Sequence, residues 1–209
     1  MLAVTVLSGL STTALSVSAD TQTITGNSSA SIALKGTLGK FDPGTTDPTD
    51  PNAPGLGNEW NKVILPTTMQ YSSGDNDKFV GGTGFVTNNS PYPVSYQITG
   101  FTGADRKSSP DITHLVNLSI DNFVVDPAVN DGATTLVKDS KLADLSSSKL
   151  VVLGGYGKDR QDHTGRSSQE SLVVRGTLEK GTSSAKQIIQ NNTLTFTLTG
   201  LDADGHVPA

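Results

Sequence analysis

The sequence predicts an all-β protein, namely an antiparallel β-sandwich of the immunoglobulin-like or jelly-roll-like kind. Three observations predict it. Apolar and polar residues alternate with a period of two in many short stretches, helical periodicity is nearly absent, and 22 glycines and 10 prolines mark frequent turns. Short strands separated by turn clusters are typical of such a sandwich, which we expect to contain at most one or two short helices. A length of 209 residues fits a single domain.

The N-terminal segment predicts export. Leu2 to Leu10 is mostly apolar, and the run closes on Val17-Ser18-Ala19. An apolar core followed by a small-x-small site is typical of a secretory signal peptide, here residues 1–19, which leaves a mature domain of residues 20–209. No Lys or Arg precedes the apolar run, so we expect that basic residues are missing upstream. The last residues, Asp202 to Ala209, contain Pro208 and stop abruptly, which leaves open whether a closing strand is also missing.

The first third of the mature chain contains two expected strands and a long loop. Asp20 to Ser29 is polar and predicts no regular structure, whereas Ser31 to Leu38 alternates as a strand does. Asp42 to Gly57 repeats Asp-Pro pairs, which exclude both helix and sheet hydrogen bonding and predict a long exposed loop within the domain. Val63 to Tyr71 follows as a strand, in which Pro66 indicates either a sheet edge or a bend.

The clearest strand lies in the middle of the chain. Val94 to Thr99 alternates apolar with hydroxyl and amide side chains, which predicts one face on a core and one face in water. The turn residues Asn88-Asn89-Ser90-Pro91 precede it. Before that turn, two apolar pairs are separated by Gly81 to Gly84, where we expect a bulge or a tight loop.

The C-terminal half adds further strands, which we expect at Leu115–Val125, Leu150–Leu153, Leu172–Leu178 and Thr193–Thr199. Short helices fit best at Lys138 to Ser148, where Leu142 and Leu145 are three residues apart, and at Ser183 to Gln190.

Several of these segments resemble a known family. An exported chain without cysteine, the Asp-Pro-rich loop, the Val-x-Leu-Pro-Thr strand at Val63 and the Val-Thr-Asn-Asn-Ser segment at Val86 resemble WxL-type surface proteins of Gram-positive bacteria. The resemblance covers roughly Gly36 to Phe101 and the final strand. It implies a secreted, extracellular protein of the cell-wall surface. Its partners would be peptidoglycan or another wall glycan and other surface proteins, bound non-covalently as in adhesion.

The resemblance departs from the family at its defining motif. The chain has no Trp-x-Leu, because its only tryptophan, Trp60, is followed by Asn61-Lys62, and Phe196 stands where a second motif would be expected. The chain also resembles the TasA and camelysin group, whose members carry an Asn-Asn motif before a strand. That likeness implies the alternative function, a homo-oligomeric subunit of an extracellular matrix fibre assembled by strand exchange.

The sequence contains no pattern typical of an enzyme. The histidines His114, His163 and His206 lie far apart, without metal-ligand spacing, and no Gly-x-Ser-x-Gly occurs. We therefore expect a non-enzyme with no catalytic, cofactor-binding or metal-binding residue. A net charge of −5 without a basic cluster argues against nucleic acid, and no later stretch is long enough to span a membrane. The oxygen-rich turns Asp75–Asp77 and Asp202–Gly205 leave calcium as a minor alternative.

Three aromatic residues are candidates for contact with a glycan or a partner protein: Trp60, Tyr92 and Tyr156. Trp60 lies among polar residues, where an exposed indole could stack on sugar rings. Burial in the core is the equal alternative, since tryptophan is usually mostly buried. The loops Asp42 to Gly57 and Asp159 to Ser168 are expected to carry the remaining contacts.

Overall fold

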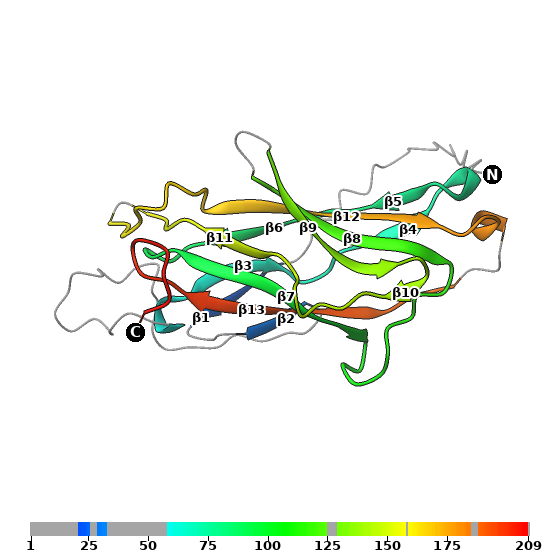
Figure 1. The fold of residues 1–209 in the computed structure, drawn as a ribbon, viewed down its shortest axis with the longest axis horizontal. Helices are drawn as coiled ribbons and strands as arrows, with labels where there is room; N and C mark the ends of the chain where they lie inside the picture. The colour runs from blue at the N-terminus through cyan, green and yellow to red at the C-terminus, as the bar shows by residue number, and fades with distance from the viewer. Residues whose placement is uncertain are drawn as a thin grey trace, which may run out of the picture.

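The fold is mostly β and its sheets are antiparallel, as predicted (Figure 1). The computed structural model describes residues 21–25, 29–32, 58–124, 129–157, 159–184 and 188–208. The larger sheet contains, in spatial order, β1 (Thr21–Thr25), β3 (Lys62–Pro66), β6 (Thr83–Asn88), β12 (Gln169–Leu178), β8 (Leu115–Val124), β9 (Val129–Lys138) and β10 (Lys141–Leu142). The second sheet contains β11 (Leu150–Leu153), β7 (Val94–Gly103), β13 (Asn192–Gly200) and β2 (Ser29–Ile32).

The short elements lie between these strands. A small third sheet pairs β4 (Tyr71–Ser73) with β5 (Phe79–Gly81). The helical turns in the described part of the chain are three-residue 3-10 helices, η1 (Asn58–Trp60), η2 (Asp75–Asp77) and η3 (Thr182–Ser184). None of the helices found in that part is long and apolar enough to cross a bilayer.

The inward faces of the two larger sheets share one core. Alternation along β7 buries Tyr96 and Ile98, and alternation along β12 buries Leu172 and Val174 in the same hydrophobic cluster. The ring of Tyr96 packs against that of Phe196 on β13, with centroids 6.1 Å apart. Fully burying each such side chain contributes about 1.5–3 kcal/mol, so this shared cluster is what holds the sheets together.

The strands place two different sets of loops at opposite ends of the long axis (Figure 1). We call residues 89–93, 154–157, 159–168 and 201–206 the loop end. We call residues 68–73, 101–115, 178–183 and 188–194 the pocket end. Strands β7 and β12 run from the first end to the second.

Three expectations were wrong. The strand expected from Val63 to Tyr71 is two strands, because β3 ends at Pro66 and β4 begins at Tyr71 in another sheet. The polar segment after Asp20 was expected to lack regular structure, but it forms β1, which pairs with β3 through backbone groups. The helix expected at Lys138 to Ser148 is absent: Asp139 and Ser140 adopt left-handed φ angles of 50° and 59°. Such a pair forms a tight hairpin turn, so β9 folds back into β10.

Three expectations concern residues that are wholly or mostly outside the described part of the chain. These are the signal peptide at residues 1–19, the Asp-Pro-rich loop at 42–57 and most of the strand expected at Ser31 to Leu38, of which Ser31 and Ile32 belong to β2.

Candidate functional site

The three aromatic candidates gather at the loop end, but only two of them reach the surface. Trp60 is 2 % exposed. Its indole meets the ring of Tyr92 edge to face, with centroids 5.5 Å apart and planes at 70°. Of the two alternatives that the sequence left open for Trp60, the structure therefore shows the buried one. The buried indole thus packs against the inner side of the Tyr92 ring.

Tyr92 and Tyr156 are held near each other by the backbone. Tyr156 is 56 % exposed, and its N–H donates to the carbonyl of Ser90 at 2.8 Å. Tyr92 is half-buried, and burial raises the pKa of its phenol. The chain from Gly154 to Tyr156 thus runs alongside the turn that carries Tyr92.

Asn88 is the hub of this arrangement. Its side chain is fully buried, and Nδ2 donates to the carbonyls of Tyr92 and Gly154, both at 2.8 Å. Its Oδ1 accepts the N–H of Ser90 at 2.8 Å. One side chain therefore satisfies three backbone groups that no sheet hydrogen bond reaches, which fixes the position of the loop around Tyr92.

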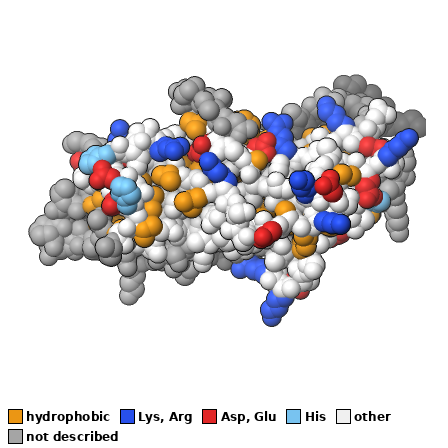
Figure 2. Space-filling view, viewed as in Figure 1, with side chains coloured by type: hydrophobic (Ala, Val, Ile, Leu, Met, Phe, Trp, Pro, Cys, Tyr) orange, Lys and Arg blue, Asp and Glu red, His pale blue; other side chains and the backbone are white. Residues whose placement is uncertain are grey.

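The loop at 159–168 is tied to the same end. The N–H of Gln161 donates to the carbonyl of Pro91, and the N–H of His163 donates to that of Ala203. The His163 ring nitrogen Nδ1 lies 2.9 Å from Asp204 Oδ1, in a pair that is mostly exposed. Figure 2 shows histidine and acidic side chains side by side over this end of the molecule. Backbone hydrogen bonds therefore position the exposed pair of His163 and Asp204 at the same end as Tyr156.

The oxygen-rich turns use their carboxylates to order the backbone. Asp202 Oδ1 accepts the N–H groups of Asp204 and His206, at 3.0 and 2.8 Å. Asp77 accepts those of Gly181 and Ser183, at 2.6 and 2.7 Å. These hydrogen bonds hold the pKa values of Asp77 and Asp202 below their usual range. Among the described residues, no three His, Asp or Glu side chains form a group that could hold a metal ion.

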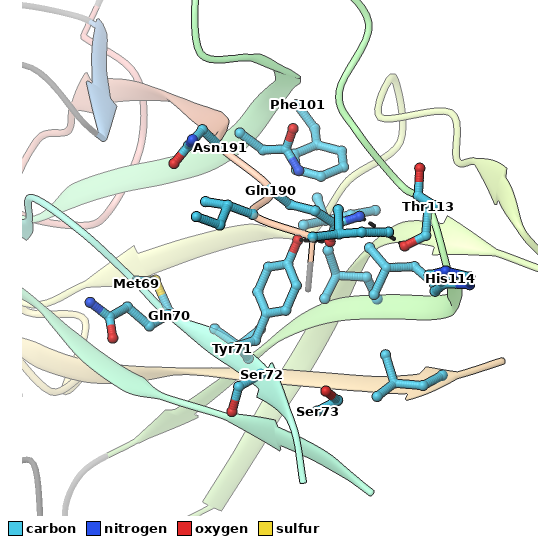
Figure 3. A pocket seen from close by; sticks show the side chains of 18 of the residues that line it. Met69, Gln70, Tyr71, Ser72, Ser73, Phe101, Thr113, His114, Gln190 and Asn191 are labelled. Atoms are coloured by element: carbon cyan, nitrogen blue, oxygen red, sulfur yellow. Dashed lines mark hydrogen bonds between the residues drawn. The ribbon is translucent and has the colours of Figure 1, made fainter. Parts of the chain in front are cut away.

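The opposite end contains a cavity of about 1010 Å³ (Figure 3). It opens where β4, the start of β8, the end of β12 and the segment before β13 diverge. Its apolar lining includes Phe101, Leu115, Leu118, Ile120, Leu178 and Leu194. The side chains of Ile188 and Ile189 also line it, although both are exposed at the surface. Exposed isoleucines beside an apolar cavity are typical of a binding site.

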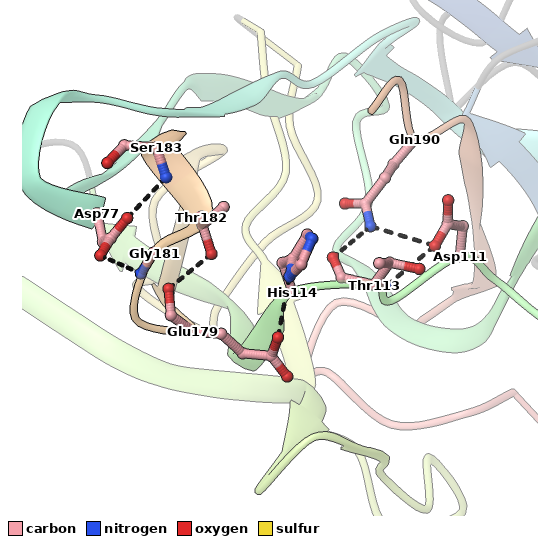
Figure 4. Close-up of polar contacts among 9 residues, drawn as sticks. All are labelled: Asp77, Asp111, Thr113, His114, Glu179, Gly181, Thr182, Ser183 and Gln190. Carbon is pink, nitrogen blue, oxygen red and sulfur yellow. Dashed lines mark hydrogen bonds and ion pairs between the residues drawn. The ribbon is translucent and has the colours of Figure 1, made fainter. Parts of the chain in front are cut away.

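One hydrogen-bonded network borders this cavity (Figure 4). Gln190 Nε2 donates to the carbonyl of Thr113 at 2.8 Å and to Asp111 Oδ1 at 3.3 Å. The Tyr71 hydroxyl donates to Gln190 Oε1 at 2.8 Å. Burial raises the pKa of Tyr71. A hydrogen bond with the Asn192 side chain offsets part of this rise, and the nearby Asp111 carboxylate adds to it. Nearby, His114 Nδ1 lies 2.9 Å from Glu179 Oε2.

A buried carboxyl group lies between the two ends. Glu170 is 2 % exposed on the inward face of β12, and its Oε2 is 3.4 Å from the Tyr96 hydroxyl. That hydroxyl lies 2.9 Å from Asn122 Oδ1. Burial and the nearby Asp131 carboxylate raise the pKa of Glu170 to about 7. The Tyr96 hydroxyl donates its proton to Asn122 Oδ1 or to Glu170 Oε2, and the hydrogen bond to Glu170 offsets part of the rise in its pKa.

This carboxyl group can hold a proton near neutral pH, which is a property that catalytic acids share. Glu170 and Asp131 are also the pair of carboxylates that such chemistry would require. However, the core covers Glu170 almost completely, so a substrate has no access to it. Sequence reasoning missed this residue, although its position two residues before Leu172 places it on the inward face.

Comparison of the chain with models of protein families, with curated proteins and with solved structures gives no match. The functional assignment therefore depends on the geometry of the two ends.

Proposed function

We propose that the protein is an exported, non-enzymatic binding protein of a Gram-positive cell surface. In this proposal its two larger sheets form a β-sandwich that acts as a rigid scaffold. The loop end associates non-covalently with wall glycan or with other surface proteins. The observation that supports this proposal best is the grouping of Tyr92 and Tyr156 on loops that the buried side chain of Asn88 holds in place.

The chemistry of the loop end suits a glycan. The exposed Tyr156 ring offers a flat apolar face for a sugar ring, and its hydroxyl can donate or accept a hydrogen bond. The neighbouring His163 and Asp204 add polar groups at the surface. Because the backbone around them is already ordered by hydrogen bonds, little conformational entropy is lost on binding.

Retention on purified peptidoglycan tests this proposal. The chain starting at Asp20 should sediment with the wall polymer, and Tyr156→Ala should reduce its affinity about threefold to tenfold. Phe85→Ala is the matched control, because Phe85 is similarly exposed but lies on β6 outside the loop end. Failure of the unaltered chain to sediment, or equal loss in both variants, would contradict the proposal.

Fibre assembly by strand exchange is the second candidate function. Strand β1 forms one edge of the larger sheet and β2 forms one edge of the second sheet. Residues 26–28 separate the two strands, so one N-terminal segment completes both sheets. A neighbouring protomer could supply the same two strands through the same backbone hydrogen bonds.

Negative-stain microscopy of concentrated protein tests this second function. Fibres should form, and a synthetic peptide of residues 21–32 added in excess should block them by occupying both edges. A scrambled peptide of the same composition is the control. Strictly monomeric particles, or fibres that both peptides leave unchanged, would exclude strand exchange through this segment.

A further inference from the structure

A cluster of buried polar side chains joins the two larger sheets near the loop end. Tyr96 comes from β7 of the second sheet, and Asn122 and Glu170 come from β8 and β12 of the larger sheet. Each of these residues is at most 2 % exposed. The Tyr96 hydroxyl oxygen lies 2.9 Å from Asn122 Oδ1 and 3.4 Å from Glu170 Oε2. The phenol therefore connects the two sheets through polar contacts.

This phenol has one proton to donate and two acceptors within reach. Burial and the nearby Glu170 carboxylate raise the pKa of Tyr96 well above its usual value, so the phenol keeps its proton at neutral pH. Asn122 Oδ1 can accept whatever the pH. Glu170 accepts more strongly as a carboxylate than as a neutral acid, because charge assistance makes a hydrogen bond roughly twice as strong. The charge of Glu170 therefore decides which acceptor Tyr96 prefers.

The surroundings of Glu170 compensate its negative charge poorly. The titratable groups that face it come from four elements: Tyr96 on β7, Asp131 on β9, Lys149 before β11 and Arg166 in the loop at 159–168. Its pairing partners on β6 and β8 are valines. Both cations also lie 3.9 Å from Asp131 Oδ1, so they are shared with a second carboxylate. An ionised Glu170 is therefore a buried charge that draws in water or polar groups.

Glu170 is also close to the loops of the loop end. It is the second residue of β12, which begins directly after the loop at 159–168. The carbonyl of Ser168, at the end of that loop, accepts the N–H of Asn88 at 2.8 Å. Asn88 is the hub that holds the two tyrosine-bearing loops. Movement at the start of β12 therefore reaches the loop end first.

We propose that Glu170 makes the ordering of the loop end sensitive to pH. While Glu170 is neutral, Tyr96 donates to Asn122 and the two sheets stay in contact beneath the loops. When Glu170 ionises, the phenol turns to the carboxylate, Asn122 loses its donor, and water that solvates the charge enters between β7 and β12. The loops that carry Tyr92 and Tyr156 then open more often. A consequence for glycan affinity rests on the proposed function, whereas the opening itself does not.

Hydrogen exchange of the full chain at about pH 6 and about pH 8, corrected for intrinsic exchange rates, tests the proposal. The Asn88 and Tyr156 amides donate to Ser168 and Ser90 at the loop end. Because Glu170 has a pKa of about 7, their protection should fall about tenfold at the higher pH. The Glu179 amide, which donates to His114 at the pocket end, should keep its protection. Unchanged protection at the loop end, or an equal fall at Glu179, would overturn the proposal.

Two variants assign the effect to one carboxyl group. Glu170→Gln keeps the shape of the side chain but cannot ionise, so loop-end protection should be equal at both pH values. Glu179→Gln is the matched control, because this carboxyl group is half-exposed at the pocket end. It should leave the pH dependence of the loop end unchanged. A remaining fall in Glu170→Gln, or loss of the fall in Glu179→Gln, would also overturn the proposal.

Retention on peptidoglycan separates this proposal from the proposed function. The unaltered chain should be retained less at about pH 8 than at about pH 6, and Glu170→Gln equally at both. Absence of retention together with pH-dependent exchange would contradict the glycan surface alone. Exchange that does not depend on pH, together with retention, would contradict the role of Glu170 alone.

Discussion

The two ends of the molecule extend from the same strands but are built differently. At the loop end, the buried Asn88 side chain and backbone hydrogen bonds join the connections, so the loops that carry Tyr92 and Tyr156 are fixed. At the pocket end, the strands diverge over apolar residues, and side chains such as Gln190 bridge the gap. A β scaffold can therefore carry a rigid polar surface at one end and a hollow apolar site at the other.

Asparagine substitutions test this difference, and we expect the largest effect at the loop end. Asn88→Ala should lower the free energy of unfolding by at least about 3 kcal/mol, because three buried backbone groups lose their partner. Asn192→Ala removes two hydrogen bonds to the Asp111 backbone at the less buried pocket end. We expect about 1–2 kcal/mol there. Urea unfolding of both variants measures the difference, and equal losses would break the comparison.

The dependence of the unfolding free energy on pH tests the buried Glu170, which lies on β12 between the two ends. The folded pKa of Glu170 is about 7, above its ordinary value of 4.5, so the folded state retains a proton that the unfolded state loses. Stability from this group is therefore fully present below pH 4.5 and is lost as the pH rises to about 7. The decrease in unfolding free energy is up to about 3 kcal/mol.

Glu170→Gln is the control for this titration, because a neutral amide of the same shape cannot titrate. The variant should show a flat unfolding free energy over that pH window. A decrease in both proteins would assign the pH dependence to other groups.

Glycine substitutions compare how rigid the two ends are, with smaller expected effects. A Cβ on Gly155 would clash with the backbone carbonyl of Pro91, whereas a Cβ on Gly103 would first meet the side chain of Ser108. The serine can rotate away and the carbonyl cannot. Gly155→Ala should therefore cost about 2–3 kcal/mol and Gly103→Ala about 1 kcal/mol. Thermal unfolding measures both, and the reverse order would contradict the proposed rigidity of the loop end.

Much of the sheet structure follows from alternation in the sequence. The expected strand Leu150–Leu153 coincides with β11, and Leu172–Leu178 and Thr193–Thr199 fall within β12 and β13. Strand β9 was missed because its pairing with β8 is interrupted by register shifts, which break the period of two. The hairpin turn at Asp139 and Ser140 requires left-handed backbone angles at two residues that are not glycine, and the sequence pattern does not predict such angles.

The sites were harder to predict than the strands. Tyr92 and Tyr156 could be identified as candidates, but Asn88 was read as a turn residue rather than as the hub that joins their loops. The cavity depends on Tyr71 and Gln190, which are far apart in the sequence and meet only when β4 approaches the start of β13. Contacts between residues so far apart in the sequence depend on how whole sheets pack, and the alternation of apolar and polar residues does not predict that packing.

Chemical-shift mapping tests the central claim, that the loop end is the surface for wall glycan, most directly. Soluble peptidoglycan fragments titrated into the isotopically labelled chain should shift amide signals at residues 89–93 and 154–157. Signals at residues 188–194 should stay unchanged. Shifts confined to the pocket end, or no shifts at saturating fragment, would contradict the account.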